Sequence, residues 1–195
     1  MSDWANKGWP SLVQDMRGRF QSEGIDTMFR TDAHDGYDTV EWLAAQRWCN
    51  GKVGLNGISY YAMNQWQVAS LQPPHLVAMC IWEGAADFYR DFTHHGGILS
   101  MMPSLWFPMQ IVSVQHGLGK RGYRSRIVAD WVSGPENLTE EELGANRRDF
   151  GEDVYSHSMD NDEYWRSRMP DWSKVTVPFL SAANWGGQGL HPRGN

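Results

Sequence analysis

The most constraining feature of the sequence is an abrupt change from strand-like to helix-like residues within 53–62. An apolar run ends at Gly57-Ile58-Ser59, and a segment with helical spacing follows at once. This order is typical of a serine held on a tight turn between a strand and a helix, with its hydroxyl clear of the sheet. Small residues near the serine, Gly57 and Ala62, let neighbouring backbones pass close to the turn. The pattern predicts Ser59 as a nucleophile, although structural turns collect glycine and serine as well.

Strand-like and helix-like patterns alternate along the first 86 residues. Unbroken apolar runs indicate buried strands, and apolar residues recurring every three or four positions indicate amphipathic helices. The expected order is strand 11–15, helix 35–46 with Asp35 as its N-cap, strand 53–58, helix 60–71 and strand 76–82. Strands joined through helices predict an α/β fold, with a parallel sheet covered on both faces. Catalytic groups in such sheets lie at the carboxyl ends of the strands, where Ser59 is expected.

The character of the sequence changes after residue 86. No clear strand is expected between 87 and 172, and strand character returns at 177–184. Helices are expected at 105–117, at 160–168 and from Thr139, where Glu142 completes a capping box. The predicted organisation is a first part of the core at 1–86, a helical cap inserted at 87–172, and a truncated return to the core at 173–195.

Composition and charge exclude several classes of protein. A net charge of −6 argues against nucleic acid as a partner. No apolar run reaches the roughly 18 residues that a membrane-spanning helix needs, and the N-terminus lacks the apolar stretch of a signal peptide. Cys49 and Cys80 lie in unlike surroundings, so no disulfide framework is expected, and a cytoplasmic location is the default. No metal site is expected either. No cofactor is expected, and the sequence leaves a homo-oligomer open.

Eight short motifs follow one another in a characteristic order. They are Asp15-Met16-Arg17-Gly18, Ser22-Glu23-Gly24, Asp35-Gly36-Tyr37-Asp38, Glu41-Trp42, Trp48-Cys49-Asn50-Gly51-Lys52-Val53-Gly54, Gly57-Ile58-Ser59-Tyr60, Gln65-Trp66 and Asp87-Phe88-Tyr89-Arg90-Asp91. Together they resemble the X-Pro dipeptidyl-peptidase-like (peptidase S15) hydrolases, the group that includes cocaine esterase and α-amino acid ester hydrolases (CocE/NonD hydrolases). The resemblance is close across 11–99, looser through the cap, and resumes at 177–185.

The resemblance implies an α/β-hydrolase core, an inserted helical cap, usually a C-terminal jelly roll, and a Ser-Asp-His triad in that chain order. Carried onto this sequence, it makes Ser59 the nucleophile and the backbone N–H of Tyr60 one oxyanion donor. The triad acid should follow the strand at 177–184, but Gly187 stands at that place. The histidine should follow a further strand beyond residue 195. The triad Asp and His are therefore not identified in this chain, which resembles a fragment incomplete at both ends.

Two functions stay open at this stage. The favoured one is a serine hydrolase that cleaves carboxylic esters of small molecules, or acyl-peptide or amide bonds, through an acyl-enzyme on Ser59. A serine hydroxyl needs a base, so the isolated chain is expected to be inactive without the histidine segment, and missing strands would make it prone to aggregate. The alternative is a degenerate, non-catalytic relative that keeps the fold for binding or assembly, as Gly187 would suggest.

Other polar residues are weaker candidates. His94 and His95 could bind a metal, but neighbouring residues seldom point to the same side, so a loop position is favoured. His191 lies close to the place of the missing acid, yet its position in the chain order is wrong for the triad base, which favours a structural or pocket-lining role. Glu83 and Asp87 are the nearest acids that could replace the missing one.

Three further observations bear on loops and on specificity. Asp15 is expected to end its strand and to fix a loop through an internal ion pair. Residues 60–64 supply no carboxylate to hold an amino group, which favours an ester or a neutral acyl substrate. Trp106, Phe107 and Trp131 could line an apolar pocket or simply pack in the core.

Overall fold

The computed structural model describes residues 2–185 and residue 191, and divides into two compact units. One unit comprises Met1–Asp26 with Gln110–Arg147, and the other comprises Thr27–Met109 with Arg148–Asn195. The domain boundaries expected from the sequence, near residues 86 and 172, stay a prediction.

A three-stranded parallel sheet forms the centre of the second unit. Its strands are β1 (Val53–Ile58), β2 (Leu76–Trp82) and β5 (Phe179–Ala182), in the order β1-β2-β5. The first two strands have the predicted bounds, and the third is shorter than the expected 177–184. All pairs are parallel, so the strands end at one edge of the sheet. The predicted α/β class is confirmed.

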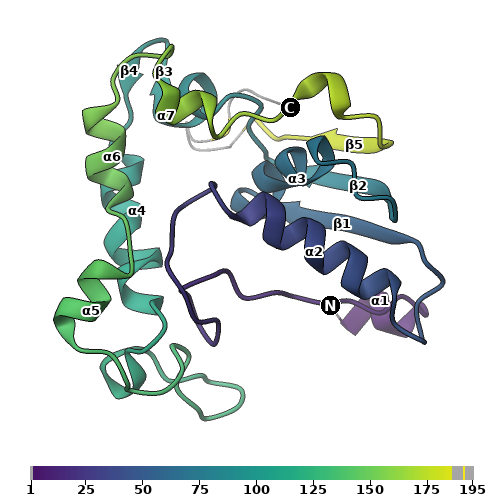
Figure 1. Ribbon diagram of the computed structural model, residues 1–195, viewed down its shortest axis with the longest axis horizontal. Helices are drawn as coiled ribbons and strands as arrows, with labels where there is room; N and C mark the ends of the chain where they lie inside the picture. Colours follow the sequence, from purple (N-terminus) through teal and green to yellow (C-terminus); the bar gives the residue numbers. More distant parts are fainter. Residues whose placement is uncertain (1, 186–190, 192–195) are drawn as a thin grey trace. The chain divides into compact units, whose positions relative to one another are not determined.

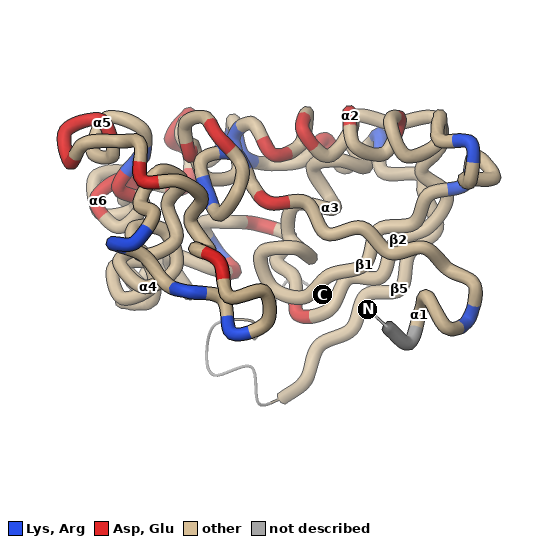
Figure 2. The backbone as a smooth tube through the Cα atoms, turned by 90° about the horizontal axis from the view of Figure 1, so that it is seen from below, with Lys and Arg blue, Asp and Glu red and all other residues tan. Residues whose placement is uncertain are grey.

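Two helices, α2 (Asp32–Ala44) and α3 (Tyr60–Ser70), lie on one side of this sheet in Figure 2. Residues of the helices and of the strands meet there in a buried cluster that includes Val40, Trp66 and Ile81. On the opposite side Ile58, Trp82 and Leu180 remain 40–57% exposed. The two helices therefore cover one face of the sheet and hold its strands in place.

Helix α2 begins three residues before the predicted start, so Asp35 lies inside the helix rather than at its N-cap. Thr31 occupies the cap position without a side-chain hydrogen bond. The carboxylate of Asp32, the first helical residue, accepts a hydrogen bond from the Phe29 backbone N–H at 3.1 Å. A carboxylate at this end is favoured by the positive end of the helix dipole.

The remainder of the second unit is mostly short helices. The helix predicted at 105–117 is found at 102–110, so it starts and ends earlier than expected. The helix predicted at 160–168 covers only 163–166. The elements of this remainder are the π-helix η1 (Phe88–Thr93), β3 (His94–His95), β4 (Ile98–Leu99), α4 (Met102–Gln110), α6 (Phe150–Ser156), α7 (Glu163–Arg166) and η4 (Trp172–Lys174). The last residue of α4 falls in the first unit. The expectation of no strands here is wrong, because β3 and β4 pair as an antiparallel hairpin.

The first unit contains α1 (Ser2–Asn6), two 3-10 turns, η2 (Val112–Val114) and η3 (Gly119–Arg121), and α5 (Glu140–Ala145). The predicted capping box is present: the Glu142 carboxylate accepts from the Thr139 N–H at 2.8 Å, and the Thr139 hydroxyl accepts from the Glu142 N–H at 3.2 Å. A buried ion pair joins Arg19 to Asp26.

The prediction of a strand at 11–15 is wrong. No strand is assigned there, and Leu12 and Val13 are 48% and 60% exposed. An apolar run becomes a buried strand only where a neighbouring strand satisfies its backbone, and none pairs with this run among the described residues. No helix in the described part of the chain is long and apolar enough to cross a membrane.

Candidate active site at the end of the first strand

Ser59 lies on the turn between β1 and α3. Figure 1 labels both of these elements. The backbone of Ser59 adopts φ 59° and ψ −119°, a conformation that residues other than glycine rarely take. The Ser59 N–H donates to the carbonyl of Trp82 at 3.0 Å, and its own carbonyl accepts from the Met63 N–H at 2.9 Å. The sheet on one side and the helix on the other thus hold the residue in this conformation, and it remains partly exposed.

Close packing around the turn explains the small residues that flank the serine. A Cβ on Gly57 would lie 2.7 Å from the carbonyl carbon of Tyr61, which is closer than real Cβ atoms approach backbone. Ala62 is fully buried, and a Cβ on Gly84 would lie 3.7 Å from its methyl group. Gly57 therefore lets the first turn of α3 fold back against the end of β1, as the sequence pattern predicted.

The side chain of Tyr60 anchors the start of α3. Its hydroxyl donates to the Asp32 carboxylate at 2.6 Å and accepts from the Phe29 N–H at 3.2 Å. Its ring stacks on that of Phe29, with the centroids 3.9 Å apart. The side chain is buried, so the orientation of the peptide between Ser59 and Tyr60 is fixed. The role of the Tyr60 N–H as an oxyanion donor stays a prediction.

His191 is brought directly against the serine. Its Nε2 lies 3.0 Å from the Ser59 Oγ, and its Nδ1 lies 3.2 Å from the carbonyl oxygen of Gly84. The ring is buried beside that of Phe92. Burial lowers the pKa of His191, because desolvation disfavours the imidazolium. The chain order of the sequence favours a structural or pocket-lining role for this residue.

Only a weak signal in the sequence pointed to His191. It follows a strand whose carboxyl end shares an edge with that of β1, and glycines flank it. Those two features place a loop near Ser59, but they do not say which side chain of the loop turns inward. The contact joins residues 132 positions apart, so only tertiary structure reveals it.

The acids considered as substitutes have other partners. Glu83 follows β2 with φ 51°, and its carboxylate accepts a hydrogen bond from the side-chain amide of Asn184. Asp87 caps η1 by accepting from the Arg90 N–H at 2.9 Å. Gly187, at the expected place of the triad acid, lies outside the described residues.

His94 and His95 form strand β3 rather than a loop. The His94 Nδ1 lies 3.0 Å from the Thr93 hydroxyl, and burial lowers the pKa of His94. Neither ring nitrogen of His95 has a hydrogen-bond partner among the described residues, although both are buried. In the same part of the chain, no group of three or more His, Cys, Asp or Glu residues could hold a metal ion.

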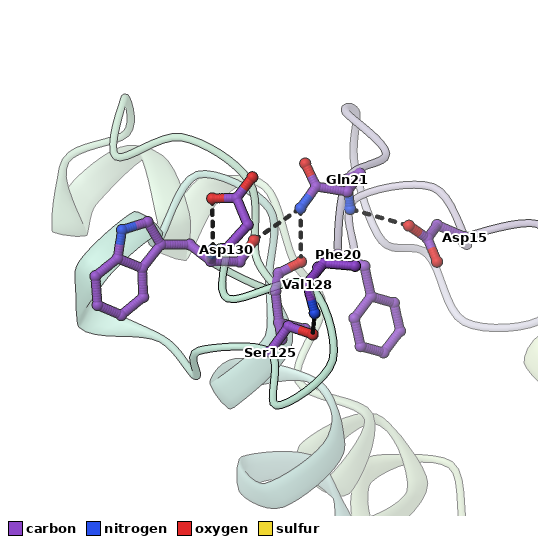
Figure 3. A pocket seen from close by; sticks show the side chains of 8 residues that line it. Asp15, Phe20, Gln21, Ser125, Val128 and Asp130 are labelled. Carbon is purple, nitrogen blue, oxygen red and sulfur yellow. Dashed lines mark hydrogen bonds between the residues drawn. The ribbon is translucent and has the colours of Figure 1, made fainter.

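A separate open pocket of about 370 Å³ lies within the first unit (Figure 3). The carboxylate of Asp15 accepts from the Gln21 backbone N–H at 3.1 Å, and the Gln21 side chain donates to the carbonyl of Trp131 at 2.8 Å. Asp15 therefore does fix a loop, here through a backbone hydrogen bond. Trp131 lines this pocket, whereas Trp106 stacks on Tyr60 in the other unit.

The fold and the serine turn together define a class of protein. A parallel sheet in which a strained strand-to-helix turn presents a serine at the carboxyl edge is the arrangement of the α/β-hydrolases. The family model of X-Pro dipeptidyl-peptidase (S15 family) matches residues 1–193. The chain belongs to this family of hydrolases.

Individual relatives agree with this assignment. Cocaine esterase of Rhodococcus sp. (strain MB1 Bresler) is 30% identical over 200 residues, which cover 94% of this chain and 34% of the esterase. A CocE/NonD family hydrolase of Staphylococcus aureus superimposes with a TM-score of 0.69 at 33% identity, covering 92% of this chain and 28% of the hydrolase. An aminopeptidase of a marine sediment archaeon (Thaumarchaeota archaeon) shares the fold, with a TM-score of 0.52 at 20% identity, over 91% of this chain and 33% of that one. The chain thus spans about a third of the length of these relatives.

Proposed function

We propose that this chain carries the nucleophile of a serine hydrolase, and that Ser59 forms an acyl-enzyme with carboxylic esters or with acyl-peptide or amide substrates. The observation that carries the proposal is the strained backbone of Ser59 at the carboxyl end of β1, with φ 59°. Strain of this kind costs on the order of 1–3 kcal/mol and persists where the surroundings enforce it, which is typical of active sites.

The surroundings of Ser59 suit the chemistry of acyl transfer. The α3 helix begins at the next residue, so its positive dipole end faces the position where a tetrahedral oxyanion would form. The N–H of Tyr60 is proposed as one donor to that oxyanion, and removal of one such donor typically costs about 10²–10³ in rate. The anchored ring of Tyr60 would keep the donor aligned without reorganisation during the reaction.

The substrate class is proposed from the first turn of α3 and from the relatives. Residues 60–64 present no carboxylate that would hold an amino group beside Ser59, which favours small ester or neutral acyl substrates. One relative is called an esterase, whereas the family is named for X-Pro dipeptidyl-peptidase. Comparison of p-nitrophenyl acetate with an Xaa-Pro p-nitroanilide distinguishes the two substrate classes.

The test of Ser59 is labelling with a fluorophosphonate probe, followed by mass spectrometry of the labelled peptide. Ser59→Ala is expected to abolish labelling. Ser70→Ala changes another serine of α3, whose hydroxyl donates to the Gln67 carbonyl at 2.8 Å, and is expected to leave labelling unchanged. Labelling that survives Ser59→Ala would contradict the proposal.

The rival proposal is a degenerate relative that binds or assembles without catalysis, and the glycine at position 187 favours it. It predicts a folded chain that the probe does not label. The expected inactivity of the chain on its own also stays a prediction, and hydrolysis of p-nitrophenyl acetate by way of Ser59 would refute it. The labelling experiment decides between a reactive Ser59 and the degenerate relative.

A further inference from the structure

The hydroxyl of Tyr60 belongs to a three-way hydrogen-bond arrangement at the start of α2. It donates to the Asp32 carboxylate at 2.6 Å, a distance typical of a strong hydrogen bond to an ionised group. The Phe29 N–H donates to the same carboxylate oxygen at 3.1 Å and to the Tyr60 hydroxyl at 3.2 Å. Asp32 is the first residue of α2, where the helix dipole favours its charge. The carboxylate therefore fixes both the end of the Tyr60 side chain and the backbone that precedes the helix.

The backbone that leads into α2 is strained where it contacts Tyr60. Met28 and Phe29 have φ values of 43° and 59°, and both side chains are buried. Residues with a bulky side chain rarely adopt such angles, which persist where the surroundings enforce them. The turn lets Phe29 place its N–H against the Tyr60 hydroxyl and its ring against the Tyr60 ring. The strain in this turn is thus accompanied by contacts with the residue that follows Ser59.

Two stacked aromatic rings restrict the Tyr60 ring further. The Phe29 ring lies 3.9 Å from it at an interplanar angle of 19°, and the Trp106 ring of α4 lies 6.1 Å from it at 17°. Stacking hinders movement perpendicular to the rings, but stacked pairs accept a range of offsets, so the rings can slide past one another. A hydrogen bond at the hydroxyl prevents that sliding. The contact with Asp32 therefore supplies the restraint that stacking lacks.

The position of the Tyr60 side chain bears on the serine because one planar peptide joins the two residues. The Ser59 carbonyl accepts from the N–H groups of Ala62 and Met63, both at 2.9 Å, so the first turn of α3 holds one end of that peptide. The Tyr60 side chain holds the other end through its Cα. A peptide group is rigid and planar, so its N–H cannot turn independently of these two anchors.

We infer that Asp32 is a positioning residue for the reaction of Ser59, which holds the Tyr60 N–H in line with the oxyanion by way of the Tyr60 hydroxyl. The inference rests on the proposed function of Ser59. Asp32 acts through Tyr60 rather than by contact with the substrate. A preorganised donor stabilises the oxyanion more than the ground-state carbonyl. Misalignment of the N–H should therefore slow the chemical step more than it weakens binding.

The experiment measures fluorophosphonate labelling of Ser59 over a range of probe concentrations. This series separates the dissociation constant of the probe from the rate constant of the bond-forming step. Asp32→Ala is expected to lower the rate constant about 10-fold, a part of the 10²–10³ that removal of an oxyanion donor costs. The dissociation constant should stay within about twofold of that of the unmodified chain. Asp32→Asn keeps an oxygen that can accept from the Tyr60 hydroxyl, so its rate constant should lie between the two.

Tyr60→Phe removes the same hydrogen bond from its other side and keeps the backbone N–H. We expect its rate constant to fall by an amount similar to that of Asp32→Ala. Residues that act through one shared interaction are not additive, so the double variant should lose no more than either single variant. Additive losses in the double variant would show that the two side chains act independently, and would overturn the inference.

Asp149→Ala is the matched control, because it also removes a carboxylate from the start of a helix in the same unit. Asp149 caps α6 by accepting from the Glu152 N–H at 3.0 Å. Its loss should lower stability but leave the rate constant of labelling unchanged. An unchanged rate constant in folded Asp32→Ala would overturn the role of Asp32 and leave the proposed function intact. An unmodified chain that is folded but not labelled would overturn both.

The NMR signal of the Tyr60 amide covers the case in which Asp32→Ala fails to fold. Asp32→Asn has nearly the same shape as the original side chain but offers a neutral acceptor, which forms a weaker hydrogen bond. We expect the Tyr60 amide signal to shift and its hydrogen exchange to become faster in Asp32→Asn, and neither to change in Asp149→Ala. An unchanged Tyr60 amide in Asp32→Asn, together with an unchanged rate constant of labelling, would overturn the inference.

Discussion

Replacement of Gly57 by alanine tests the physical origin of the serine turn. The added methyl group would lie 2.5 Å from the Cβ and 2.7 Å from the carbonyl carbon of Tyr61. Both atoms belong to the first turn of α3, and neither is the end of a flexible side chain. Ordinary contacts begin near 3.4 Å, so the helix start must move by close to 1 Å or the strand end must bend.

The cost follows from that displacement. Overpacking of a well-packed site typically costs 1–3 kcal/mol, and contact with backbone belongs at the upper end, so we expect a loss of about 3 kcal/mol in the free energy of unfolding. For a domain of this size each kcal/mol lowers Tm by about 2–4 °C, which gives a fall of roughly 6–12 °C. The same movement shifts Ser59, so labelling by the fluorophosphonate should fall as well.

Gly54→Ala provides the control on the same strand. A Cβ there would meet only the carbonyl oxygen of Ala78, at an ordinary 3.6 Å. Thermal and urea denaturation of both variants should show a large loss for Gly57→Ala and little change for Gly54→Ala. Equal stability of the two variants, with Ser59 still reactive in Gly57→Ala, would refute the close-approach argument.

Two further predictions concern the anchor of α3 and the buried histidines. Tyr60→Phe removes the hydroxyl that donates to the Asp32 carboxylate, and hydrogen bonds to charged groups contribute about 1.5–3 kcal/mol; urea denaturation should show a loss of that size, and a change below about 0.5 kcal/mol would contradict it. Burial lowers the folded-state pKa of His191 and His94, so the unfolded state binds more protons below about pH 6.5 and stability must fall as pH decreases through that window. The urea midpoint should therefore be lower at pH 5 than at pH 7.5, and His191→Asn should reduce this difference; the same pH dependence in the variant would exclude a contribution from His191.

The sequence predicted the centre of the fold well because its signals there are local. Strands β1 and β2 have the predicted bounds, and α3 ends one residue before its predicted end. Each is an apolar run or a helical pattern bounded by glycine or proline, so propensity and burial agree. The requirement for Gly57 beside Ser59 is also local, since it arises between residues four positions apart.

Elsewhere the local signal was absent or misleading. The two-residue strands β3 and β4 are too short to show alternation, and α6, which Asp149 caps, covers only two turns. The apolar run at 11–15 had the composition of a strand but no partner strand. Pairing with a neighbouring strand depends on the whole fold, and a sequence pattern indicates only that a segment is able to form a strand.

The edge of the sheet explains why strained backbone is concentrated around Ser59. Ile58 pairs with Trp82 in register, so the residues that follow them, Ser59 and Glu83, are neighbours at the ends of adjacent strands. Both have positive φ, and the Ser59 N–H donates to the Trp82 carbonyl between them. The turn at Ser59 presents the hydroxyl, and the turn at Glu83 leads to the Gly84 carbonyl, which lies 3.2 Å from the His191 Nδ1. One parallel pair of strands therefore positions both Ser59 and the carbonyl that His191 contacts, and a substitution that relaxes either turn should separate Ser59 from His191.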